Sequence, residues 1–139
     1  MVSTHALSRL WHSALAVLIV FALLGQIGLV IDGHGRSLIN LFSYFTIQSN
    51  LLILVASVLI ALKPDRDGEL FAIFRLAGLV GITLTGIVYS TVLAGTVEFV
   101  GAAWWYDKVF HYAVPVGAVL GFLLFQPRTR FARSDVVFV

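Results

Sequence analysis

The chain contains no cysteine, and only 12% of its 139 residues are charged. Without cysteine there is no disulfide framework, no thiolate nucleophile and no zinc–thiolate or iron–sulfur site. A soluble domain has roughly 25% charged residues, whereas 60% of this chain is hydrophobic and its mean hydropathy is +1.00. A soluble fold could not bury so much apolar surface, so the composition predicts an integral membrane protein.

Four hydrophobic stretches are long enough to cross a bilayer, whose hydrocarbon core takes about 20 helical residues. They cover about residues 11–31, 38–62, 70–95 and 109–125. The first is longer than the apolar core of a signal peptide and lacks a small-residue cleavage site, so we interpret it as a retained helix. The fold class predicted is an all-α transmembrane bundle with four spans, forming one domain over residues 1–139.

The nine basic residues are scattered near the ends of these stretches and form no basic face, although the pI is 9.3. We therefore expect a lipid bilayer as the partner and no nucleic acid. Seven of the nine fall on the side that holds both termini, and two fall on the other side. The positive-inside rule then predicts cytoplasmic termini, with the 32–37 turn and the 96–108 loop outside.

Small residues at a spacing of four predict where the helices pack closely, because close approach drives helix association in lipid. Gly117 and Gly121 have this spacing in the fourth span. Ala77 and Gly81 have it in the third, followed by Gly86. We expect helix contacts at these positions.

Polar residues are unusually dense in the second span, where an unsatisfied polar group costs several kcal/mol. On a continuous helix, Ser43, Thr46, Asn50 and Ser57 would lie within about 60° of one another. This polar stripe must face protein or trapped water. Gln48 is a further amide in the same window, and amides need several partners.

His111 carries a second polar feature. Asp107 precedes it by four residues, a spacing that lets the carboxylate hold one ring nitrogen and leave the other as a base. Pro115 follows by four residues and cannot donate to the His111 carbonyl, which predicts a bent or opened helix. By the predicted topology, Thr46 and His111 share the outer half of the bundle. Brought together, a hydroxyl and an imidazole make a nucleophile and its general base.

The residues that carry these features resemble a known family. Residues 43–52 (SYFTIQSNLL), residues 83–89 (TLTGIVY) and His111 with Pro115 are similar to the bacterial integral-membrane proteins of the Pr-six-Pr family. That family is distantly similar to the androgen-induced membrane proteins of animals, threonine hydrolases that cleave fatty acid esters of hydroxy fatty acids. The resemblance to the bacterial family covers nearly the whole chain and implies a protein of the cell membrane without a cofactor. The more distant similarity to the animal enzymes rests on fewer residues and implies Thr46 as nucleophile and His111 as base.

Members of both groups have six helices, which implies that this chain corresponds to a form shortened after four. Residues 135–139 are then the start of a fifth helix. Polar groups on the second and third spans would lack partners from the later helices, and association of chains into a homo-oligomer would supply them.

Three functions fit the sequence. The first is a hydrolase of lipid esters, with Asn50 or Gln48 stabilising the oxyanion. The second is a transporter or ligand-binding protein, in which a pocket open to the outside and without an imidazole near its threonine is lined by Thr46, Gln48, Asn50, Thr85 and Tyr89. The third is haem ligation by His34 and His111 on the outer side of a four-helix bundle.

Overall fold

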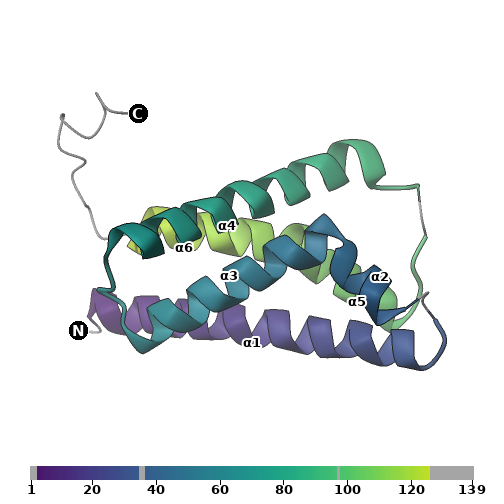
Figure 1. Ribbon diagram of the computed structural model, residues 1–139, viewed down its shortest axis with the longest axis horizontal. Coiled ribbons are helices and arrows are strands. Elements are labelled where there is room, and N and C mark those ends of the chain that lie inside the picture. The colour runs from purple at the N-terminus through teal and green to yellow at the C-terminus, as the bar shows by residue number, and fades with distance from the viewer. Residues whose placement is uncertain (1–2, 35–36, 97, 126–139) are drawn as a thin grey trace.

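The computed structural model describes residues 3–34, 37–96 and 98–125, and this part of the chain is helical and forms no strand (Figure 1). The elements are α1 (Thr4–Ile31), α2 (Leu38–Ser43), α3 (Phe45–Leu62), α4 (Glu69–Val88), η1 (Tyr89–Leu93), α5 (Ala102–Lys108), η2 (Val109–Ala113) and α6 (Val114–Phe125). The two η elements are π-helical turns, of which η1 continues α4 and η2 joins α5 to α6. The predicted start of a fifth helix at residues 135–139 lies outside the described residues.

Four helices are long and apolar enough to cross a membrane, so the fold is the all-α transmembrane bundle that the sequence predicts. They run over Thr4–Ile31, Phe45–Leu62, Glu69–Leu93 and Ala102–Phe125. The fourth begins seven residues before the predicted start, so the second half of the expected outer loop is helix. Its aromatic residues Trp104, Trp105 and Tyr106 lie on α5. The side of the membrane that the termini face stays a prediction.

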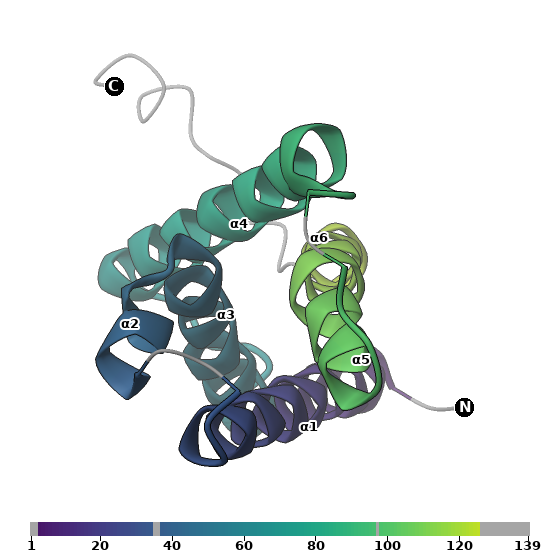
Figure 2. The ribbon, with the colours of Figure 1, turned by 90° about the vertical axis from the view of Figure 1, so that its right-hand side faces the viewer.

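The four spans form a closed ring in which each packs against two neighbours, in the order α1, α3, α4, α6 (Figure 2). Two clusters of buried apolar side chains fill the ring. One is built from Leu15, Ile19, Ile53, Leu79, Ile82, Val114 and Ala118. The other lies nearer α2 and consists of Ala22, Leu41, Ile47 and Phe110. Many other large apolar side chains are exposed on the outside of the ring, as expected for surfaces that contact lipid.

Glycines in the fourth and third spans make the predicted close contacts. A Cβ at Gly117 would lie 3.1 Å from Leu15, and one at Gly121 would lie 2.7 Å from the Trp11 indole nitrogen. Trp11 Nε1 also donates to the Gly117 carbonyl over 2.9 Å. In α4 the prediction that Ala77 and Gly81 together contact another helix is wrong at Ala77, which is exposed. Gly78 and Gly81 are the residues that face α3.

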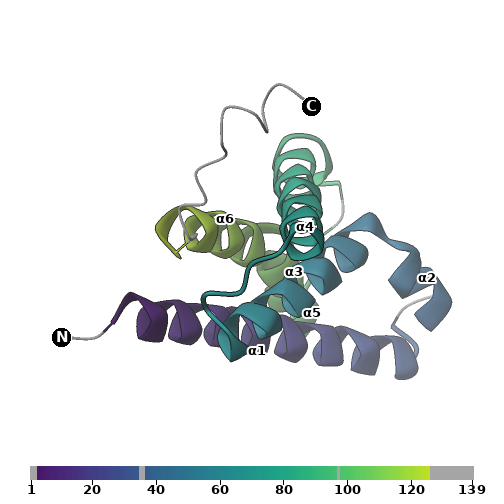
Figure 3. The ribbon, with the colours of Figure 1, turned by 60° about the vertical axis from the view of Figure 1, so that its left-hand side comes forward.

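The second hydrophobic stretch is broken at Tyr44, whose extended backbone (ψ 134°) separates α2 from α3. Polar side chains satisfy the broken backbone: Ser43 Oγ donates to the Ile39 carbonyl, and Gln48 Nε2 donates to the Phe42 carbonyl. A serine that bonds back one turn favours such bends. The predicted polar stripe is therefore wrong at Ser43, which lies on α2 at an angle to α3 (Figure 3).

Candidate functional site

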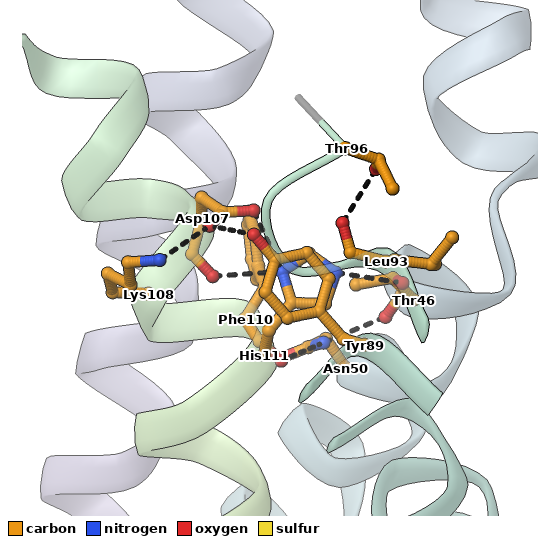
Figure 4. A network of polar contacts seen from close by, with 9 residues as sticks. All are labelled: Thr46, Asn50, Tyr89, Leu93, Thr96, Asp107, Lys108, Phe110 and His111. Carbon is orange, nitrogen blue, oxygen red and sulfur yellow. Dashed lines mark hydrogen bonds and ion pairs between the residues drawn. The ribbon is translucent and has the colours of Figure 1, made fainter. Parts of the chain in front are cut away.

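Thr46 and His111, which the predicted topology places in the same half of the bundle, lie in contact. The Thr46 hydroxyl oxygen is 3.2 Å from His111 Nε2 (Figure 4). Thr46 is the second residue of α3, and His111 is the middle residue of the π turn η2. The break at Tyr44 thus places the hydroxyl on the first turn of a new helix, where it meets an imidazole from a helix 65 residues later in the chain.

Asp107 holds the other side of the His111 ring, also as predicted. His111 Nδ1 lies 2.9 Å from the Asp107 backbone carbonyl and 3.1 Å from the carboxylate oxygen Oδ1. Both atoms are acceptors, so Nδ1 carries the hydrogen. A neutral ring then has its lone pair on Nε2, which faces the Thr46 hydroxyl. This is the tautomer that a general base for Thr46 requires.

Tyr89 contacts both His111 and Asp107. Its ring stacks on the His111 imidazole, with centroids 3.7 Å apart and planes inclined by 19°. Its hydroxyl donates to Asp107 Oδ2 over 2.5 Å, and Lys108 Nζ lies 3.4 Å from the same oxygen. The sequence suggested Tyr89 as a pocket-lining residue and gave no signal for its contact with Asp107, which joins the first residue of η1 to α5.

The opened turn around His111 follows from Pro115 and is stabilised by Asn50. In η2 the Val114 N–H bonds the Val109 carbonyl, five residues back. In that register residue 115 would donate to the Phe110 carbonyl, but proline has no N–H. Asn50 Nδ2 supplies the missing donor over 3.3 Å, and it also donates to the Thr46 carbonyl over 2.8 Å. Pro115 thus leaves the Phe110 carbonyl without its π-helical donor, in addition to the His111 carbonyl to which an α-helical residue 115 would donate.

We expect Asn50→Asp to destabilise the protein by about 3 to 5 kcal/mol, the cost of an uncompensated buried charge. Asn50 is 1% exposed, and both of its amide contacts are to carbonyl oxygens. A carboxylate has no hydrogen to donate to them. The free energy of unfolding in detergent measures the effect. Gln48→Glu is the matched control because Gln48 is exposed. Equal losses of unfolding free energy in the two variants would contradict a stabilising role for the contacts of Asn50 with the two carbonyls.

A pocket of about 460 Å³ adjoins the Thr46–His111 pair at the end of the bundle where α2 lies. The surface of its walls is mostly apolar, although about half of the side chains that line it are polar. The residues that line it are Gln26, Val30, His34, Ser37, Asn40, Leu41, Tyr44, Thr46, Ile47, Tyr89, Leu93, Thr96, Phe99, Ala103, Asp107, Phe110 and His111. Sequence reasoning missed Gln26, Ser37 and Asn40, whose only signal is that they are polar and lie near neighbouring helix ends.

Three residues suggested for substrate binding do not line this pocket. Gln48 is exposed and bonds the Phe42 carbonyl. Thr85 is buried, and its hydroxyl lies 2.8 Å from that of Ser49. Asn50 is held between two backbone carbonyls. Each of these polar groups makes hydrogen bonds to a helix backbone or to a side chain on a neighbouring helix. Thr46 and Tyr89, in contrast, do line the pocket.

His34 and His111 line the same pocket, as the haem hypothesis requires. Both nitrogens of His111, however, have partners: Nδ1 contacts Asp107 and Nε2 contacts Thr46. An iron ligand would have to displace one of these contacts. Over the described ranges no group of three or more histidine, aspartate or glutamate side chains is arranged to hold a metal ion.

The fold and the site define a multi-pass helical membrane protein with a threonine–histidine pair beside a largely apolar pocket. No protein-family model matches the chain, and no curated protein or solved structure matches it either. The function must therefore be argued from the geometry of the pair and its pocket.

Proposed function

We propose that this protein is a cell-membrane hydrolase of lipid esters, of the Pr-six-Pr type, with Thr46 as nucleophile and His111 as general base. The observation that carries the proposal is the 3.2 Å contact between the Thr46 hydroxyl and His111 Nε2. Nδ1 of the same ring faces a carboxylate. Nucleophile, base and a group that orients the base form the arrangement that activates a hydroxyl in acyl transfer.

In the first half of the reaction the Thr46 oxygen attacks the ester carbonyl while His111 Nε2 takes the hydroxyl proton. The C–O bond to the alcohol then breaks, and the imidazolium returns that proton to the departing alcohol. The acyl group is now bound to Thr46. In the second half a water molecule attacks this ester, His111 takes a proton from the water, and the threonine oxygen leaves with that proton. The net products are a fatty acid and an alcohol.

The first turn of α3 supports the charge that develops on the carbonyl oxygen. Tyr44 ends the preceding turn and makes no side-chain cap, and the first backbone donor inside the helix is Gln48. The N–H groups of residues 45–47 belong to the first turn and therefore have no acceptor within α3. Such N–H groups and the positive end of the helix dipole stabilise an oxyanion. They replace Asn50 and Gln48 in this role, because the amides of those two residues are bonded elsewhere.

The surroundings of the pair favour a lipid substrate. The walls of the pocket include Val30, Leu41, Leu93, Phe99 and Phe110, which suit an acyl chain. The bundle itself is predicted to lie among lipids, which brings lipid esters close to the pocket. An ester bond is a bond that a hydroxyl nucleophile can exchange without a cofactor.

The geometry of the pocket supports a hydrolase better than a transporter. The transport hypothesis expected a pocket lined by five polar residues with no imidazole near Thr46. Only Thr46 and Tyr89 of those five line the pocket, and the imidazole of His111 contacts the threonine hydroxyl. These two facts favour a hydrolase.

The test is covalent labelling of the purified protein by a long-chain fluorophosphonate, which reacts with activated hydroxyl nucleophiles. We expect labelling of the wild type, none of Thr46→Ala, and retained labelling of Thr46→Ser, because serine keeps the hydroxyl. Thr96→Ala is the matched control: Thr96 also lines the pocket, but its hydroxyl donates to the Leu93 carbonyl. Labelling that is absent from the wild type, or that persists in Thr46→Ala, would rule the nucleophile out.

A further inference from the structure

The Asp107 carboxylate can orient the His111 ring only if the carboxylate itself keeps one orientation. Oδ1 faces His111 Nδ1, whereas Oδ2 receives the Tyr89 hydroxyl at 2.5 Å and Lys108 Nζ at 3.4 Å. The carboxylate is 5% exposed, and the Lys108 side chain is 35% exposed. Half-exposed ion pairs contribute little, and the tyrosine hydrogen bond is the shorter and more buried of the two. Tyr89 is thus the main partner of Oδ2.

His111 also needs its ring in one plane. The nucleophile lies on α3, the carboxylate lies on α5, and the imidazole must meet both at once. Rotation of the ring about its bond to Cβ would move Nε2 away from the Thr46 hydroxyl. The Tyr89 ring lies 3.7 Å from the imidazole and nearly parallel to it, so it occupies the space into which the ring would turn. This contact involves the same tyrosine that holds the carboxylate.

The geometry points to Tyr89 as a positioning residue of the hydrolase, which fixes the Asp107 carboxylate with its hydroxyl and the His111 ring plane with its aromatic face. This inference rests on the proposed function and assigns Tyr89 a role other than the substrate binding suggested by the sequence. Tyr89 lies on η1 and His111 on η2. The unit of Thr46, His111, Asp107 and Tyr89 is therefore assembled from α3, α5 and both π turns.

Kinetics of fluorophosphonate labelling separate the two contacts. Tyr89→Phe keeps the stack and loses the hydrogen bond, and we expect the maximal labelling rate to fall about tenfold, the effect of one hydrogen bond. Tyr89→Leu loses both contacts, and we expect a fall of about a hundredfold, the cost of misplacing a reacting group by an ångström. The probe concentration at half-maximal rate changes less than twofold in Tyr89→Phe, because the ring still lines the pocket. Tyr112→Phe makes the same chemical change on a ring packed edge-on against Tyr89, and we expect it to label like the wild type.

A spectroscopic measurement tests the role without any reaction. Nitrogen NMR of protein carrying isotope-labelled histidine distinguishes the two ring tautomers, and His111→Gln identifies the signal of this histidine among the four. We expect a single tautomer protonated at Nδ1 in the wild type and in Tyr112→Phe, and exchange between tautomers or ring orientations in Tyr89→Leu.

The outcomes separate this inference from the proposed function. If the wild type is not labelled but Tyr89→Leu disturbs the His111 signal, the hydrolase fails and the positioning contact stands. If the wild type is labelled and both Tyr89 variants match Tyr112→Phe in rate and in spectrum, the hydrolase stands and the role of Tyr89 is overturned. A loss of labelling with an unchanged His111 spectrum in Tyr89→Leu would assign Tyr89 to probe binding and would also overturn it.

Discussion

His111→Gln is expected to lower the maximal rate of ester hydrolysis by about a hundredfold to ten-thousandfold, the usual contribution of general acid–base catalysis. Glutamine can still bond the Thr46 hydroxyl, which lies 3.2 Å from His111 Nε2 in the wild type, but its amide cannot accept the proton. The nucleophile therefore stays protonated, and the alcohol that leaves has no acid to protonate it. Hydrolysis of a long-chain ester by the purified protein in detergent micelles measures kcat and KM separately.

His34→Gln is the matched control, because His34 lines the same pocket and does not contact Thr46. We expect its kcat to stay within about threefold of the wild type, as for a surface change away from the reacting atoms. If both histidine variants lose activity equally, or if His111→Gln raises KM and leaves kcat unchanged, His111 binds substrate and is not the base.

Gly86→Val is expected to destabilise the protein by about 1 to 3 kcal/mol, the range for overpacked contacts, and to lower the labelling rate about a hundredfold. A Cβ at Gly86 would lie 3.0 Å from Pro115 Cβ and 3.5 Å from the His111 carbonyl oxygen. The ring of Pro115 is rigid, so α4 must move away from the start of α6, and with it from η2. That movement separates Tyr89 on η1 from His111 and so disturbs the base.

Gly28→Val is the control for the loss of a helical glycine, because no atom lies within 4 Å of a Cβ placed there. Denaturant unfolding followed by tryptophan fluorescence gives the stability, and fluorophosphonate labelling gives the rate. A Gly86→Val protein that labels at the wild-type rate would show that the approach of α4 to η2 is not needed to place His111.

Much of the fold follows from the sequence because hydrophobic length alone determines a membrane span. The sequence also predicted that Thr46 and His111 share one half of the bundle and that the i, i+4 spacing places Asp107 beside the ring, but not that the two side chains touch. The break at Tyr44 was not predictable, because it lies within an apolar stretch with no proline or glycine. It depends on Ser43 and Gln48 bonding nearby carbonyls, which composition does not reveal.

The hydrogen bonds of the polar residues near the site could not be predicted from the sequence either. Gln48 and Asn50 stood out in the sequence as costly amides in a span, and cost alone suggested a role in binding. The structure shows that such an amide can instead donate to a backbone carbonyl. Asn50 donates to the carbonyl of Phe110, which has no donor in the π-helical register because residue 115 is proline. A single sequence gives the spacing of Pro115 from His111, but it does not show which side chain replaces the lost donor.

The wide turn at Val109–Ala113 contains one residue more than an α-helical turn would. Deleting one residue there would let α5 and α6 run on as an ordinary helix of nearly the same length and hydropathy. The helices on either side would keep nearly the same orientation, because a π turn holds its extra residue by widening. The side chains within the turn would change direction, and the imidazole would leave the hydroxyl. The gain or loss of a single codon therefore separates a bilayer-spanning chain that has this pair from one that lacks it, which is a short evolutionary step in either direction.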